Sequence, residues 1–196
     1  MRQSYLTILF LLAATALFAQ SDFLEDFNTQ RLQKQQTGML VLGTWAALNI
    51  AGGLVLSGQK DGVAKNFHLM NAGWNVINLG IAGLGYYSAM HSDPAFFDLP
   101  STLHEQHKFQ KILLFNAGLD VGYMLGGAYL IERSKNVLKN TDRLKGFGQS
   151  IILQGAFLFV FDLVNYAIHA AQNPALQKFI GALGSTPNGL GFYLNF

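Results

Sequence analysis

The sequence contains no cysteine, which excludes disulfide bonds, thiolate metal ligands, iron–sulfur clusters and thiol nucleophiles. Charge is also scarce, because Asp, Glu, Lys and Arg make up 12% of the 196 residues, against about 25% in ordinary soluble proteins. The net charge of +2 provides no clustered basic surface, so nucleic acid is not an expected partner. Few charges, together with 21 glycines and 16 phenylalanines, are typical of a protein that contacts lipid.

The first residues predict export. Arg2 precedes an apolar stretch over residues 5–18, and Ala19 offers a small residue for cleavage before Gln20. This order is typical of a secretory signal peptide. We therefore predict a signal peptide over residues 1–19, cleaved near Ala19, with an uncleaved anchor helix as the alternative.

Four further segments are long enough to cross a hydrocarbon core of about 30 Å. Asp120 is the only charge in the third segment, Asp162 is the only one in the fourth, and the first two have none. We predict an all-α fold, a four-helix transmembrane bundle that forms one membrane domain over residues 20–196. An exported soluble bundle is the alternative, but its helices would need charged outer faces. The predicted spans are residues 38–56, 69–90, 112–131 and 150–171.

Polar residues separate these spans. They predict loops at residues 93–111 and 132–145, and turn residues at 186–189 precede an aromatic end at 192–196 that is either a strand or an interfacial segment. The 132–145 loop is rich in Lys and Arg, which favours a cytoplasmic position. We therefore predict a bacterial inner membrane protein of the Gram-negative type with periplasmic mature N- and C-termini, although the aromatic end leaves the choice of membrane open.

Amides recur at helical spacing within the predicted spans. In the second span, Asn71, Asn75 and Asn78 are separated by four and three residues, which places them on one helix face. Amides facing lipid would be costly, so the polar faces of the spans are expected to converge on the interior of the bundle. The other amides in this predicted polar core are Asn49, Asn116, Gln154 and Asn165.

Asp120 and Asp162 lie near the middle of their spans, and no span contains Lys or Arg. An unpaired carboxylate there costs at least about 2.5 kcal/mol, so each must be protonated, bound to a cation or held by hydrogen-bond donors. One interpretation is a proton or cation site formed with the neighbouring amides. The other is a structural polar core that fixes the register of the helices.

Histidines suggest a weaker alternative. His91, His104, His107 and His169 fall at or near the outer ends of the spans, where imidazoles close to acidic residues could bind a metal or a haem. The two histidines of residues 104–107 are three apart, whereas the His-Glu-x-x-His protease signature requires four. A metalloprotease is therefore excluded.

Several local sequences carry a family resemblance. They are Asn-Ala-Gly-Trp-Asn at residues 71–75, Phe-Asn-Ala-Gly-Leu-Asp at 115–120, Gln-Gly at 154–155 and Phe-Asp at 161–162. With the signal end, this combination resembles an uncharacterised family of small bacterial envelope proteins with four predicted spans. The resemblance implies a shape and a cellular address but no activity.

We expect a non-enzymatic membrane protein, first as a structural or accessory subunit of an envelope assembly. The first alternative is a small proton- or cation-coupled transporter or channel that uses Asp120 and Asp162. The second is a metal- or haem-binding membrane protein that uses the outer histidines. No other cofactor is expected, and the expected partners are the lipid bilayer and either an envelope protein or a second copy of the chain.

Overall fold

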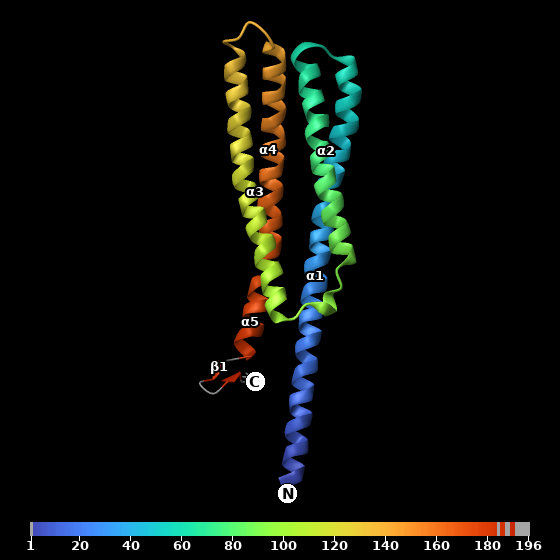
Figure 1. Ribbon diagram of the computed structural model, residues 1–196, viewed down its shortest axis with the longest axis vertical. Coiled ribbons are helices and arrows are strands. Elements are labelled where there is room, and N and C mark those ends of the chain that lie inside the picture. The colour runs from blue at the N-terminus through green and yellow to red at the C-terminus, as the bar shows by residue number, and fades with distance from the viewer. Residues whose placement is uncertain (1, 184, 187–188, 191–196) are drawn as a thin grey trace.

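The computed structural model describes the backbone of residues 2–183, 185–186 and 189–190, and the side chains of residues 21–182. Four long helices dominate these residues (Figure 1), which confirms the predicted all-α, four-helix architecture. The predicted aromatic segment at 192–196 lies outside the described residues. The four helices are α1 (Arg2–Gln59), α2 (Gly62–His91), α3 (Leu99–Ser134) and α4 (Thr141–Ala170).

Short elements complete the chain. The 3-10 helix η1 (Pro94–Phe96) lies between α2 and α3, and α5 (Asn173–Leu183) follows α4 after a two-residue turn. Strands β1 (Ser185–Thr186) and β2 (Gly189–Leu190) pair in antiparallel fashion, with Thr186 opposite Gly189; residues 187 and 188 of the turn predicted at 186–189 lie outside the described residues.

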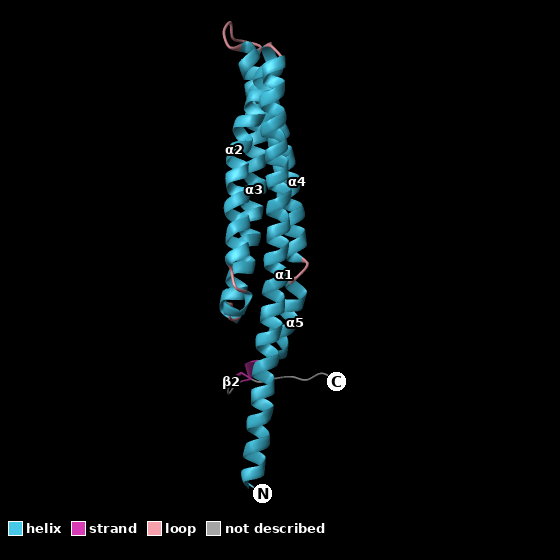
Figure 2. Cartoon of the chain, turned by 90° about the vertical axis from the view of Figure 1, so that its right-hand side faces the viewer, coloured by secondary structure: helices cyan, strands magenta, loops and turns pink. Residues whose placement is uncertain are grey.

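The helices pack as two antiparallel hairpins. α1 packs chiefly against α2 and α3 chiefly against α4, while contacts between α2 and α4 join the hairpins. The α1–α2 turn and the α3–α4 loop lie at one end of the bundle, which we name the loop end (Figure 1). The opposite end, named the η1 end, holds the α2–α3 connection. α5 lies beside α1 there (Figure 2), and the rings of Phe179 and Phe23 stack with centroids 4.2 Å apart.

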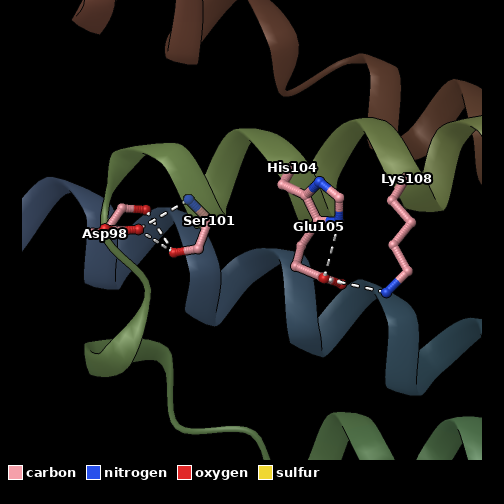
Figure 3. Close-up of polar contacts among 5 residues, drawn as sticks. All are labelled: Asp98, Ser101, His104, Glu105 and Lys108. Carbon is pink, nitrogen blue, oxygen red and sulfur yellow. Dashed lines mark hydrogen bonds and ion pairs between the residues drawn. The ribbon is translucent and has the colours of Figure 1, made fainter.

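The α2–α3 connection is shorter than the loop predicted at 93–111, because α3 already begins at Leu99. Asp98 caps this helix: its carboxylate accepts a hydrogen bond from the Ser101 amide at 2.9 Å and another from the Ser101 hydroxyl (Figure 3). These bonds hold the pKa of Asp98 below its usual range. Pro100, in the first turn, needs no amide partner. The prediction of a loop through residue 111 was therefore wrong, since capped helix replaces most of it.

The predicted 132–145 loop is also mostly helical. α3 continues to Ser134, and α4 begins at Thr141 after Asn140, which has a positive φ of 62°. Asn is among the few non-glycine residues that adopt this conformation readily. The turn between α3 and α4 is therefore confined to a few residues at the loop end.

Burial in the bundle is reversed relative to a protein folded in water. Among residues 21–182, 17 polar or charged residues are buried against 12 apolar ones, and 29 large apolar residues are exposed. Leu84, for example, is 75% exposed, whereas Asn75 and Gln154 have no exposed surface. By length and composition, two helical stretches of the described residues, Ser21–Gln59 and Thr141–Ala182, could cross a membrane.

Candidate functional site

Gln154 of α4 is the centre of a buried hydrogen-bond network near the loop end. Its carbonyl oxygen accepts a bond from the Trp45 indole at 2.9 Å, and its amide donates to Asn71 at 3.1 Å and to Asn49 at 3.4 Å. Ser150, one turn earlier, donates a 2.5 Å bond to the same Asn71 oxygen. The network thus joins α1, α2 and α4, and we name it the Gln154 network.

The asparagines of α2 continue this network along the helix. Asn75 donates to the Asn71 carbonyl at 2.8 Å, and Asn78 donates to the Asn75 side chain at 3.3 Å. All three are buried, with at most 5% of their surface exposed. One face of α2 therefore points amides into the bundle, at the spacing read from the sequence.

Asp120 of α3 and Asp162 of α4 lie side by side in the interior. Their carboxyl groups are close enough to interact with each other, and the two residues are only 2% and 5% exposed. Among the described residues, nothing donates a hydrogen bond to Asp120 Oδ2. Two adjacent buried carboxyls cannot both carry a charge without a cation, so the pair needs a shared proton or a bound cation.

The Asp pair lines a cleft of about 490 Å³ between the two hairpins. Asn78 and Asn116 line the same cleft, so four of the predicted core residues meet there. Much of its wall is apolar, with Leu42 among the contributors. At the η1 end, charged and amide residues line it, namely Arg31, Gln35, Glu105 and Lys108.

The remaining predicted core residues lie elsewhere. Asn49 and Gln154 belong to the Gln154 network, whereas Asn165 donates to the Phe161 carbonyl at 2.8 Å. Asn165 lines a separate groove of about 550 Å³ between α1 and α4, with Lys34 at its edge. The structure therefore divides the predicted polar core into a network, a cleft and a groove.

Unexpected polar residues fill the η1 end. Gln106 donates to the His169 carbonyl at 2.8 Å, and Gln110 donates to the Asn173 side chain at 2.8 Å. Asn28 of α1 reaches across to Thr102 of α3 at 2.8 Å. Thr102, Gln106 and Gln110 are four residues apart, a helical period visible in the sequence, but they fell within the segment predicted to be a loop.

Arg31 of α1 belongs to this end and is only 3% exposed. Its Nε donates to the Asn28 side chain at 3.0 Å, and its guanidinium lies 4.8 Å from the centre of the Phe97 ring. Its Nη2 has no hydrogen-bond partner among the described residues. Burial lowers the pKa of Arg31, while the charge of Glu105 acts in the opposite direction.

The four histidines differ in their burial. His91, His104 and His107 are exposed on α2 and α3, and His104 lies 4.0 Å from Glu105. His169 is fully buried and packs against the Phe109 ring. Residues 21–182 contain no group of three or more His, Cys, Asp or Glu side chains that could hold a metal ion.

Comparison with known proteins places the chain in a family. A family model described as "Family of unknown function (DUF6992)" matches residues 41–163, more than half of the chain. The chain belongs to the DUF6992 family. No curated protein and no solved structure matches it. Membership in DUF6992 confirms the expected uncharacterised family, while export and an envelope location stay predictions.

The segment that matches DUF6992 covers most of the residues described above. It contains the whole Gln154 network and both carboxyls of the Asp pair, whereas Arg31 and His169 lie outside it. Sequence reasoning did not assign Ser150 to the core, because a lone serine carries no signal of its own. Arg31 was not assigned because it precedes the predicted first span.

Proposed function

We propose that the protein is a four-span membrane protein of a bacterial inner membrane, exported by a signal peptide that is removed near Ala19. The reversed burial pattern supports this, because exposed apolar surface on all four helices is costly in water and favourable in lipid. α2 and α3 have 30 and 36 residues, or about 45 and 54 Å at 1.5 Å per residue, enough for a hydrocarbon core of about 30 Å.

Within that bundle, we propose that Asp120 and Asp162 form the proton- or cation-binding site of a small transporter or channel. The observation that carries this proposal is the meeting of the two carboxyls in a cleft that charged residues line at one end. Ionisable residues inside a membrane commonly mark ion pathways. Asn78 and Asn116 line the same cleft and supply neutral oxygen ligands beside the pair.

The experiment is a flux assay with purified protein in liposomes that enclose a pH-sensitive dye, with a protonophore added for the Na⁺ and K⁺ gradients so that cation movement is reported as a compensating pH change. A pH gradient, a Na⁺ gradient and a K⁺ gradient are applied in turn. We expect flux through the wild type, and loss of flux in Asp120→Asn and Asp162→Asn because the amide cannot release a proton or neutralise a cation. Asp142→Asn is the matched control, since this residue is exposed near the start of α4.

The second candidate is a structural or accessory subunit, and the Gln154 network favours it. Its amides join three helices by side-chain bonds alone, which is what a core that fixes helix register requires. Wild-type liposomes without flux, or aspartate variants that no longer fold by circular dichroism, would contradict the transport proposal and support this one. Folded variants that lose flux would support transport.

A further inference from the structure

The cleft has two chemically different parts. Met39 and Leu42 of α1 are among the residues of its apolar wall, and the Asp pair lines the same cleft. Leu158 of α4 also lines it, on the loop-end side of Asp162. At the η1 end, Arg31, Glu105 and Lys108 line it. Glu105 and Asp120 are 15 residues apart on α3, a distance of about 22 Å at 1.5 Å per residue. We name this charged end of the cleft the mouth. A long apolar channel with a charged mouth fits an amphiphile, a molecule with an apolar chain and a charged headgroup.

Arg31 makes the mouth selective for an anion. A guanidinium has five donors and no acceptor, and leaving a buried cation without an anionic partner is costly. The nearby acid is already engaged: Glu105 accepts a 3.2 Å bond from Lys108 and lies 4.0 Å from His104 (Figure 3). No salt bridge joins Arg31 to an acidic residue within residues 21–182. The Glu105–Lys108 pair is neutral as a unit, so the charge of Arg31 remains.

The mouth also lies at the right depth. Gln35 and Lys108 precede the predicted spans at 38 and 112 by three and four residues, or about 5 and 6 Å. Lipid headgroups occupy a layer of about this thickness outside the hydrocarbon core. Arg31 precedes its span by seven residues, or about 10 Å along the helix, so its backbone lies just outside that layer and its long side chain must reach back to it. With the membrane placement proposed above, Gln35 and Lys108 face headgroups and the apolar wall faces the level of the acyl chains.

We propose that the cleft binds an anionic glycerophospholipid, with its phosphate on Arg31 and one acyl chain along the apolar wall toward Asp120 and Asp162. This proposal rests on the proposed membrane placement but not on ion flux. Arg is suited to the phosphate, because its planar donors bind two phosphate oxygens at once. The chain of a bound lipid covers the Asp pair from the η1 end.

The chain provides its own reporter. It has two tryptophans; Trp74 lines the cleft, while Trp45 lines a separate groove with Phe157 and donates to Gln154. The full chain is placed in phosphatidylcholine vesicles that contain a small share of phosphatidylglycerol with brominated acyl chains, which quench tryptophan fluorescence. Brominated phosphatidylcholine at the same share measures random contact. We expect excess quenching by phosphatidylglycerol, and loss of this excess in Trp74→Phe.

Charge variants test the mouth. Arg31→Gln is expected to raise the phosphatidylglycerol share needed for half-maximal excess quenching about tenfold, as loss of a charged hydrogen bond predicts. Glu105→Gln should lower that share, because it removes an acid beside the phosphate. Lys111→Gln is the matched control: it removes an exposed positive charge one turn from Lys108, outside the cleft.

The outcomes are distinct. An Arg31→Gln titration that coincides with that of Lys111→Gln would overturn the proposal, as would equal quenching by the two brominated lipids in the wild type. If Arg31→Gln does not fold, Lys108→Gln replaces it, because this exposed side chain lines the mouth. Flux is measured separately. Transport without excess quenching by phosphatidylglycerol would contradict the lipid site alone, and excess quenching without transport would contradict the ion site alone.

Discussion

Gln154 makes three hydrogen bonds to two other helices and has no exposed surface. Replacing it by leucine introduces an apolar side chain of similar size and leaves the Trp45 indole and the Asn71 amide with fewer partners. Polar interactions between helices in a membrane contribute about 0.6 to 2 kcal/mol each. The hydrogen bonds of this one side chain are therefore expected to contribute measurably to the free energy of unfolding.

We predict that Gln154→Leu lowers the free energy of unfolding by about 2 kcal/mol, measured by unfolding in mixed detergent with circular dichroism. Gln149→Leu is the control, because Gln149 is exposed on the same helix. Equal stability of the two variants would mean that the network contributes to neither folding nor register.

For single residues, the sequence predicts which helix face each buried asparagine occupies. It does not predict which residue forms its hydrogen bond. Spacings of four and three residues place Asn71, Asn75 and Asn78 on one side of a helix whatever surrounds it. That Ser150 donates to Asn71 depends on how α4 aligns with α2, and no local pattern specifies such an alignment. His169 was expected near an outer surface, but the structure buries it against the Phe109 ring, and Gln106 donates a hydrogen bond to its backbone carbonyl.

At the scale of the elements, α3 and α4 approach closely through two glycines. A Cβ added at Gly148 would lie 2.5 Å from the Gly127 carbonyl oxygen, and one added at Gly127 would lie 2.6 Å from the Gly148 carbonyl oxygen. Both obstacles are backbone atoms, which cannot rotate away. Small residues at helix contacts in membranes allow such backbone approach.

We predict that Gly148→Ala forces α3 and α4 apart and costs about 1 to 3 kcal/mol, the usual range for overpacking. Gly122→Ala is the matched control, since nothing lies within 4 Å of a Cβ added there; alanine's higher helix propensity should make that variant neutral or slightly more stable. Thermal unfolding of both variants compares them. Unchanged stability of Gly148→Ala would contradict the close contact.

The number of long helices was predictable from apolar length, whereas the helix ends and the short helices η1 and α5 were not. Hydropathy marks where a chain becomes too polar for lipid. A helix can continue beyond that point when its end is capped and its polar side chains are packed. Asp98 and Pro100 form a recognisable start for α3, and Thr102, Gln106 and Gln110 continue its buried face. The four-residue spacing of these polar residues, which lie before the apolar stretch, therefore indicates that α3 begins earlier than hydropathy alone predicts.

At the scale of the whole molecule, the sequence predicts a polar interior. It does not predict that the polar residues are divided among a network, a cleft and a groove. Which helices pair as hairpins, and how far the hairpins separate, depend on contacts between residues distant in sequence. α2 and α4 join the hairpins, leaving the cleft in which Asn78, Asn116 and the Asp pair meet, while Asn165 faces another groove. The sequence places Asp120 and Asp162 near the middle of their predicted spans, and whether they form an ion site or a structural core stays a prediction.

The bundle also makes a prediction about sidedness, because the α1–α2 turn and the α3–α4 loop share one end and η1 lies at the other (Figure 1). If all four helices span the membrane, single cysteines in the turn and loop must react on one side and a cysteine in η1 on the other. The absence of native cysteine removes any background. Gln59→Cys, Asn136→Cys and Ala95→Cys serve this purpose, since each position is exposed and none removes a charge that sets topology.

With a membrane-impermeant maleimide on spheroplasts, we predict that Ala95→Cys is labelled at once and that Gln59→Cys and Asn136→Cys are labelled only after lysis. This follows from the basic residues around the α3–α4 loop, which the positive-inside rule places in the cytoplasm. The reverse pattern would keep four spans and invert the orientation. Equal labelling of all three positions would contradict a spanning bundle, and the exposed apolar surface would then have to be covered by another protein rather than by lipid.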